Sequence, residues 1–231
     1  MISLGERLQQ VVSLVPTCRK IADIGTDHGY VPAWLLEKQI CREAVASDIA
    51  EGPCLAAQET KLRYHLDDRM EIRQAPGLQG LRPGETQAVV IAGMGGATIR
   101  TILEESPEIV KTVEAFILQP MNAAASLRLW AVANHYCIAE EKICREHGHY
   151  YVILLLLPGG ETVALSDFEA ETGPFILQAK PPLWKEYLRQ KADSFYNVLG
   201  QMEQSPAAVR SEKYRQLQSY CHRIEALLRQ E

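Results

Sequence analysis

Short apolar runs alternate along the chain with segments in which apolar residues recur every three or four positions. The apolar or alternating runs are typical of strands and occupy residues 20–24, 44–47, 70–73, 88–92 and 115–118. The segments of helical period occupy residues 3–15, 31–38, a stretch from about residue 53, and stretches around residues 99–103 and 127–132. Strand and helix in alternation predict a mostly parallel sheet with helices on both faces.

The pattern changes after residue 136. Residues 137–144 and 150–157 are predicted strands, and between them lies Glu146-His147-Gly148-His149, which is typical of a hairpin turn. A hairpin reverses the chain direction, so it adds one antiparallel strand to the sheet. We therefore predict an α/β, Rossmann-like fold whose twisted sheet is mostly parallel and contains one antiparallel strand.

A second region begins after Pro158-Gly159-Gly160. Apolar residues recur at helical spacing from Trp184 to Met202 and again from Leu217 to Leu228, and Ser205-Pro206 lies between the two runs. Two antiparallel helices that pack as a short coiled-coil-like hairpin explain this pattern. We predict two domains, of which residues 1–160 form the sheet domain and residues 161–231 form the helical domain.

The charge differs between these regions. The whole chain has a formal net charge of −5, which disfavours a protein that coats nucleic acid without specificity. Residues from 181 onward carry a net positive charge, whereas the preceding residues are net negative. A local basic face on the predicted helical hairpin is therefore compatible with RNA binding, although a solvated charged face explains the same residues.

Cysteine usage and hydropathy indicate the compartment. The chain has six cysteines and no CxxC pair, so we expect reduced thiols, with neither a disulfide framework nor a metal site. The N-terminal segment lacks the apolar core of a signal peptide, and the most apolar run, residues 152–157, is too short to span a membrane. We expect a soluble cytoplasmic protein that has no membrane partner.

Glycines and polar residues stand where the predicted strands end. The first strand leads into Asp23-Ile24-Gly25-Thr26-Asp27-His28-Gly29, the second ends at Asp48, the fourth at Gly93-Met94-Gly95-Gly96 and the fifth at Gln119-Pro120. In an open α/β sheet, ligands bind outside the carboxyl ends of the strands. Each residue taken singly is explained as well by helix capping or a tight turn, but their joint position predicts one binding rim.

The chemistry of the first loop favours one cofactor. Asp48 follows Asp23 by 25 residues, where an acidic side chain reaches the hydroxyls of a ribose. The loop lacks the Gly-x-Gly-x-x-Gly spacing that seats a pyrophosphate. S-adenosylmethionine has no phosphate, and its sulfonium and amino groups favour nearby carboxylates. An acidic first loop therefore indicates this methyl donor.

Five motifs together carry a resemblance to a known family. They are Asp23-Ile24-Gly25-Thr26-Asp27-His28-Gly29-Tyr30-Val31-Pro32, Ser47-Asp48-Ile49 with Gly52-Pro53, Ile91-Ala92-Gly93-Met94-Gly95-Gly96, Ile117-Leu118-Gln119-Pro120-Met121 with Leu127-Arg128, and Gly148-His149-Tyr150-Tyr151. In these motifs the chain resembles the bacterial tRNA (adenine(22)-N1)-methyltransferase family of the TrmK type. The motifs span residues 20 to about 157, and the helical hairpin is similar to that family's C-terminal appendage.

The resemblance implies a class I methyltransferase fold, S-adenosyl-L-methionine as cofactor and tRNA as partner. Expected cofactor-binding residues are Asp23, Ile24, Gly25, Thr26, Gly29, Asp48, Ile49, Gly77, Ala92, Gly93 and Met94. Expected catalytic residues are Asp27 and His28. Expected substrate-binding residues are Tyr30, Gly95, Gly96, Gln119, Pro120, Tyr150, Lys185, Arg189, Lys191 and Lys213. The oligomeric state stays open, with a monomer favoured.

One motif departs from the family pattern. Where the family usually has Gly-Asp-Gly-Leu after the third strand, this chain has Ala75-Pro76-Gly77-Leu78. The acidic side chain expected near the adenine amino group of the cofactor is missing. We therefore expect backbone groups to recognise the cofactor adenine.

The turn after the fourth strand also bears on the atom that is methylated. Enzymes that methylate the exocyclic amine of adenine typically place Asn or Asp before Pro-Pro there, whereas Gly93-Met94-Gly95-Gly96 offers only backbone and a thioether. Adenine N1 has an in-plane lone pair and needs alignment rather than deprotonation. Two alternatives stay open: a methyltransferase for small molecules, and a non-catalytic cofactor-binding or assembly protein.

Overall fold

The computed structural model describes residues 2–159 and 164–229. It divides into two compact units, Met1–Leu165 and Ser166–Glu231. The domain boundary that we predict between residues 160 and 161 lies outside the described residues.

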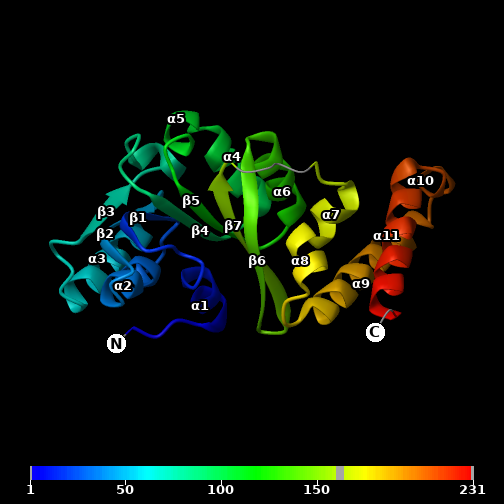
Figure 1. Cartoon of the computed structure of the whole chain (residues 1–231), viewed down its shortest axis with the longest axis horizontal. Coiled ribbons are helices and arrows are strands. Elements are labelled where there is room, and N and C mark those ends of the chain that lie inside the picture. Colours follow the sequence, from blue (N-terminus) through cyan, green and yellow to red (C-terminus); the bar gives the residue numbers. More distant parts are fainter. Residues whose placement is uncertain (1, 160–163, 230–231) are drawn as a thin grey trace. The chain divides into compact units, whose positions relative to one another are not determined.

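The first unit is built on a twisted sheet whose strand order is β3-β2-β1-β4-β5-β7-β6 (Figure 1). The strands are β1 (Cys18–Ile24), β2 (Cys41–Asp48), β3 (Met70–Gln74), β4 (Ala88–Met94), β5 (Ala115–Pro120), β6 (Tyr136–Glu146) and β7 (His149–Pro158). Strands β1 to β5 pair in parallel, whereas β7 runs antiparallel to both of its neighbours, β5 and β6. The predicted mostly parallel sheet with one antiparallel strand is confirmed.

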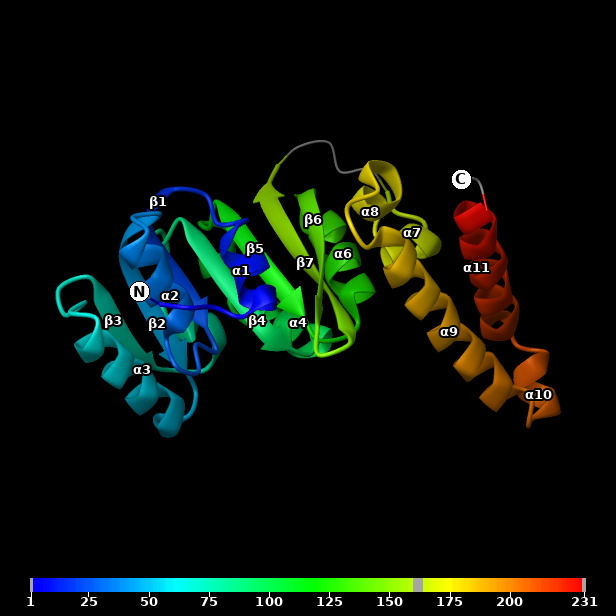
Figure 2. The same cartoon turned by 90° about the horizontal axis from the view of Figure 1, so that it is seen from below.

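Helices cover both faces of this sheet (Figure 1). On one face lie α1 (Glu6–Val12), α2 (Tyr30–Glu37) and α3 (Glu51–Arg63), and Figure 2 shows α2 and α3 side by side. On the other lie α4 (Gly96–Glu104), α5 (Pro107–Val110) and α6 (Ala124–Ala133), with the short 3-10 helix η1 (Gly77–Gly80) beside α4. Because both faces are covered, the central strands are apolar runs rather than alternating ones, and every residue of β5 is buried.

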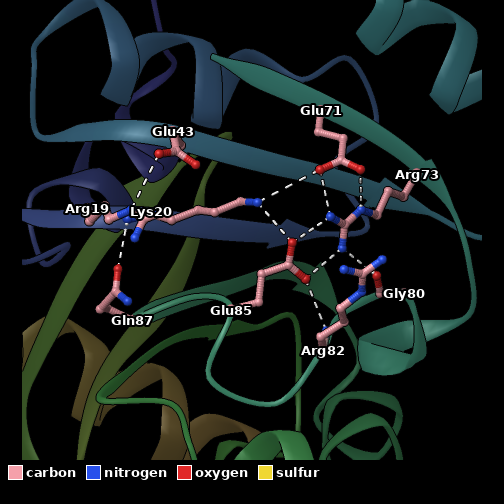
Figure 3. Close-up of polar contacts among 9 residues, drawn as sticks. All are labelled: Arg19, Lys20, Glu43, Glu71, Arg73, Gly80, Arg82, Glu85 and Gln87. Atoms are coloured by element: carbon pink, nitrogen blue, oxygen red, sulfur yellow. Dashed lines mark hydrogen bonds and ion pairs between the residues drawn. The ribbon is translucent and has the colours of Figure 1, made fainter. Parts of the chain in front are cut away.

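An ion-pair network joins the connection between η1 and β4 to the sheet (Figure 3). Arg73 Nη2 of β3 lies 2.5 Å from Glu85 Oε1 and 2.6 Å from Glu71 Oε2, and Lys20 Nζ of β1 lies 2.9 Å from Glu85 Oε1. Hydrogen bonding from Arg73, with a smaller contribution from Lys20, holds the pKa of Glu85 well below its usual range. The network fixes a connection that has no strand or helix of its own between residues 81 and 87.

The second unit is helical, with α7 (Asp167–Thr172), α8 (Pro174–Ala179), α9 (Trp184–Met202), α10 (Pro206–Val209) and α11 (Glu212–Arg229). Figure 2 shows α9 and α11 side by side. They run antiparallel, since Tyr196 hydrogen-bonds Glu225 and Tyr214 hydrogen-bonds Glu203. The predicted antiparallel pair is confirmed, whereas α7, α8 and α10 add helices that the apolar periodicity did not predict.

Candidate active site

The loop after β1 is held against β2 by its backbone. The Gly25 and Thr26 N–H groups both donate to the carbonyl oxygen of Ser47, at 2.8 and 3.1 Å. Gly25 has φ +73°, which suits glycine, but Asp27 also has a left-handed φ of 53°. This conformation is costly for Asp27, and residues kept in it concentrate at functional sites. The side chain of Asp27 is 74% exposed.

A cleft of about 440 Å³ opens beside this loop, a size suited to a small molecule. Its lining comes from the carboxyl ends of β1, β2 and β4, from the loop after β1, from the first turn of α2 and from α1. The lining residues are Arg7, Leu8, Asp23, Gly25, Thr26, Asp27, His28, Tyr30, Val31, Asp48, Ala92, Gly93 and Met94. The cleft therefore lies where ligands bind in open α/β sheets.

Two carboxylates give the cleft its chemistry. Burial raises the pKa of Asp23 to about 7; the hydrogen bond from Thr26 opposes the shift, and the charge of Asp48 adds to it. Thr26 Oγ1 donates to Asp23 Oδ2 at 2.6 Å. Asp48 ends β2, and its Oδ1 accepts a hydrogen bond from the Ala50 N–H at 3.0 Å. A bound cation would favour the ionised form of Asp23.

The end of β4 closes the other side of the cleft. We predicted that this strand stops before Gly93, but it continues through Met94 with an irregular register between Ala92 and Met94. Gly93 has φ +79°. A Cβ placed on Gly25 would lie 2.0 Å from the Met94 methyl carbon, so the two residues form one packed wall.

Three residues gather at the mouth of the cleft. The rings of His28 and Tyr30 stack with centroids 5.5 Å apart and an interplanar angle of 22°. His28 Nε2 lies 3.6 Å from Asp27 Oδ2. This arrangement presents a carboxylate and an aromatic surface together, which can hold a flat heterocycle that carries positive charge.

Comparison with known proteins agrees with this geometry. The family described as "Methyltransferase domain" matches residues 4–154. A Bacillus subtilis (strain 168) tRNA (adenine(22)-N(1))-methyltransferase is 30% identical over 98% of this chain and 96% of its own length. The chain belongs to the tRNA (adenine(22)-N(1))-methyltransferase family.

Two solved structures of similar proteins contain the methyl donor or its product. The Streptococcus pneumoniae protein Sp1610 in complex with S-adenosyl-L-methionine has a TM-score of 0.86 and 29% identity, covering 98% of this chain and 100% of its own. M. capricolum TrmK in complex with S-adenosyl-homocysteine has a TM-score of 0.81 and 27% identity, covering 97% of each chain. The Rossmann-like methyltransferase fold of this family member is thereby established.

The structure brings many of the predicted site residues of this methyltransferase to one cleft. Those that line it are Asp23, Gly25, Thr26, Asp27, His28, Tyr30, Asp48, Ala92, Gly93 and Met94. Those outside the lining are Ile24, Gly29, Ile49, Gly77, Gly95, Gly96, Gln119, Pro120 and Tyr150. Ligand contacts by this second group stay predictions.

Several residues of the second group have clear packing roles. Gly96 sits where a Cβ would lie 2.7 Å from the carbonyl oxygens of Asn122 and Ala123, so glycine is needed for close backbone packing at the start of α4. Gly29 has φ +68° and is the N-cap of α2. Gln119 has 0% exposure, and its Oε1 accepts from the Gly93 N–H at 3.0 Å. From the neighbouring strand β5, Gln119 thus holds the backbone of Gly93, which lines the cleft.

The predicted phosphate-binding residues lie in the second unit. Arg189 of α9 and Lys213 of α11 are exposed. Lys191 forms an ion pair with Glu171 of α7 at 3.0 Å, and Lys185 lies over the Trp184 ring at 5.7 Å. Their RNA contacts stay predictions.

Sequence reasoning missed Arg7 and Leu8, which line the cleft from α1. We predicted an amphipathic helix at residues 3–15 and named no site residue in it. No signal in the sequence places this helix at the carboxyl ends of the strands, because it is brought there by its packing against β5, β6, β7 and α2.

Proposed function

We propose that this protein transfers the methyl group of S-adenosyl-L-methionine to N1 of adenosine 22 in tRNA, acting in the cytoplasm as a monomer. The observation that carries the proposal is the acidic cleft at the carboxyl ends of β1, β2 and β4. Membership of the tRNA (adenine(22)-N(1))-methyltransferase family supports the choice of target. No helix among residues 2–159 and 164–229 is long and apolar enough to cross a membrane.

The cleft residues fit this cofactor. Asp48 at the end of β2 offers a carboxylate to the ribose hydroxyls. Asp23 is buried with one oxygen bonded to Thr26, so its other oxygen can accept from a cationic ligand group. Gly93 is at the cleft with no side chain, which allows close approach of the ligand to the backbone. When bound, S-adenosyl-L-methionine supplies an electrophilic methyl group at its sulfonium.

The residues at the mouth suit an adenine that reacts through N1. The N1 lone pair forms the new N–C bond while the S–C bond breaks and sulfur keeps the electron pair. The methylated adenine is cationic, and the Asp27 carboxylate at the mouth stabilises that charge. The stacked His28 and Tyr30 rings orient the base plane. No proton has to leave N1, so alignment is the main task of the site.

Recognition of the tRNA falls partly to the second unit. An adenosine inside a folded tRNA must leave its stack to enter a cleft, and aromatic surfaces compensate for the lost stacking. Arg189 and Lys213, together with Lys185 and Lys191, supply positive charge for backbone phosphates. These contacts fix the position of the tRNA, while the cleft selects the base.

The direct test incubates the purified protein with methyl-labelled S-adenosyl-L-methionine and unmodified tRNA, followed by mapping of the labelled nucleoside. We expect label on adenosine 22 as 1-methyladenosine, and none in a transcript with guanosine at that position. Label on a pyrimidine or guanine would contradict the base assignment. Methylation of small molecules without RNA, or cofactor binding without any methylation, would revive the two alternative functions.

A further inference from the structure

Arg7 of α1 brings a cation into an otherwise acidic cleft. Among the described residues that line the cleft, Arg7 is the one lysine or arginine, and the lining also includes the acidic residues Asp23, Asp27 and Asp48. A Cβ placed on Gly93 would lie 3.7 Å from Arg7 Nη1, so the guanidinium lies on the β4 side of the cleft. Its position calls for an anionic ligand group on that side.

The guanidinium is held in place by residues of three strands. Glu146 of β6 accepts from the Arg7 backbone N–H through Oε1 and from Arg7 Nε through Oε2, both at 3.2 Å. Gln119 of β5 accepts from Arg7 Nη1 at 2.5 Å, and the guanidinium lies 5.8 Å from the centroid of the Tyr151 ring of β7. Gly5 makes room for this arrangement, because a Cβ there would lie 2.8 Å from Glu146 Oε1.

These contacts leave part of the guanidinium available. Within the described part of the chain, Arg7 Nη2 has no hydrogen-bond partner, and the side chain is 21% exposed. A side chain that is already fixed loses little conformational entropy when it binds a ligand. A planar fork of N–H donors is also the geometry that best matches a carboxylate.

The strand order indicates which group reaches Arg7. Under the proposed function, the cofactor ribose lies at Asp48 at the end of β2, and β1 lies between β2 and β4 in the sheet. The amino-acid end of the cofactor therefore points past Gly25 toward Gly93 and Arg7. That end carries one ammonium and one carboxylate, and only the ammonium suits the acidic residues.

We propose that Arg7 binds the carboxylate of the amino-acid end of S-adenosyl-L-methionine. The inference rests on the proposed function, and it assigns this chain's α1 to the cofactor site. The same guanidinium can also bind a phosphate of the tRNA. The test therefore has to distinguish the cofactor carboxylate from a tRNA phosphate. The location of Arg7 in the lining of the cleft, beside Gly93, favours the cofactor.

Calorimetry without tRNA tests the inference with two ligands. S-adenosyl-homocysteine carries the carboxylate, and S-adenosyl-3-thiopropylamine is the same molecule without it. Replacing Arg7→Met should weaken binding of the first by about 10- to 100-fold, as expected for loss of hydrogen bonds to a charged group, and leave binding of the second unchanged. Arg7→Lys should keep part of the preference for the carboxylate, and it serves as the test if Arg7→Met does not fold.

Arg19→Met is the matched control, since Arg19 lies at the start of β1 and pairs with Glu43 at the surface. It should change neither affinity. Equal weakening of both ligands in the Arg7 variants would overturn the inference and leave Arg7 as a support for Gln119. Unchanged cofactor affinity with weaker tRNA binding would overturn it in favour of a phosphate. A wild-type protein that binds neither ligand would instead contradict the proposed function itself.

Discussion

Cofactor binding should be coupled to the release of a proton from the carboxyl group of Asp23. Because burial raises its pKa to about 7, the free protein holds a proton there over much of the acidic range. A cationic ligand group prefers the ionised carboxylate, so binding releases that proton. The affinity for S-adenosyl-homocysteine should therefore fall about tenfold per pH unit below pH 7 and level off above it. Calorimetry between pH 5.5 and 8 measures this slope.

Two variants assign that slope to one residue. Asp23→Asn should bind more weakly with an affinity that no longer varies with pH. His28→Gln, which changes a titratable group at the mouth of the same cleft, should keep the slope of the wild type. A pH slope that survives in Asp23→Asn would show that another group releases the proton.

Asp27 should act on the methyl transfer rather than on the cofactor. It lies at the mouth of the cleft with a strained backbone and an exposed carboxylate. Asp27→Asn keeps the shape but removes the negative charge that stabilises the cationic product, so we expect kcat to fall about 100-fold with cofactor Kd unchanged. Steady-state methylation at saturating tRNA and cofactor, together with cofactor calorimetry, measures the two quantities. Full turnover in this variant would remove Asp27 from the mechanism.

At the scale of elements, the connection from η1 to β4 depends on Glu85. Its carboxylate is bound by Arg73 and Lys20, and its side chain is only 14% exposed. Because the pKa of Glu85 is lower in the folded than in the unfolded protein, its ionised carboxylate stabilises the fold at pH values above the unfolded-state pKa. This contribution is lost progressively as the pH falls below the unfolded-state pKa. Glu85→Gln should therefore lower the free energy of unfolding at pH 7 by about 1–2 kcal/mol. The difference from wild type should shrink as the pH falls below about 4.5.

Urea unfolding at several pH values measures this difference. Glu43→Gln is the control, because Glu43 pairs with Arg19 at an exposed site, where ion pairs contribute about 0–1 kcal/mol. A deficit in Glu85→Gln that is the same at pH 7 and pH 3 would mean that packing, and not the ion pairs, explains the effect.

The spacing of apolar residues predicts helices and strands that bury one clear apolar face. It does not predict very short helices or the exact ends of strands. The strands β1, β2, β4 and β5 were predicted from their apolar runs, which helices cover on both faces, and the edge strand β3 was predicted from its alternating residues. The helix α7 was missed although Ser166 and Glu169 form a capping box, since its six residues are too few to show a period. Strand β4 runs two residues further than predicted because Met94 pairs with Pro120 past the irregularity at Gly93.

For the whole molecule, sequence motifs predicted the part of the cleft that comes from strand ends. Asp23, Asp48 and Gly93 meet because parallel strands place their carboxyl ends at one edge. Arg7 could not be predicted, because its place depends on how α1 packs across strands more than a hundred residues away along the chain. Gln119 lies at the predicted edge, but its contacts with Gly93 and Arg7 depend on its rotamer.

The segregation of charge along the chain leads to a prediction about tRNA affinity. Arg189 and Lys213 are exposed on α9 and α11, in the region whose net charge is positive although the whole chain is negative. If both contact phosphates, Arg189→Glu with Lys213→Glu should weaken tRNA binding and reduce the slope of log K against log salt by about 2, without changing cofactor affinity. Arg19→Glu with Arg42→Glu, at the exposed starts of β1 and β2 in the first unit, is the control of equal charge change. Equal losses in the control would mean that net charge alone governs binding, whereas an unchanged slope in the double variant would exclude these two residues from the RNA interface.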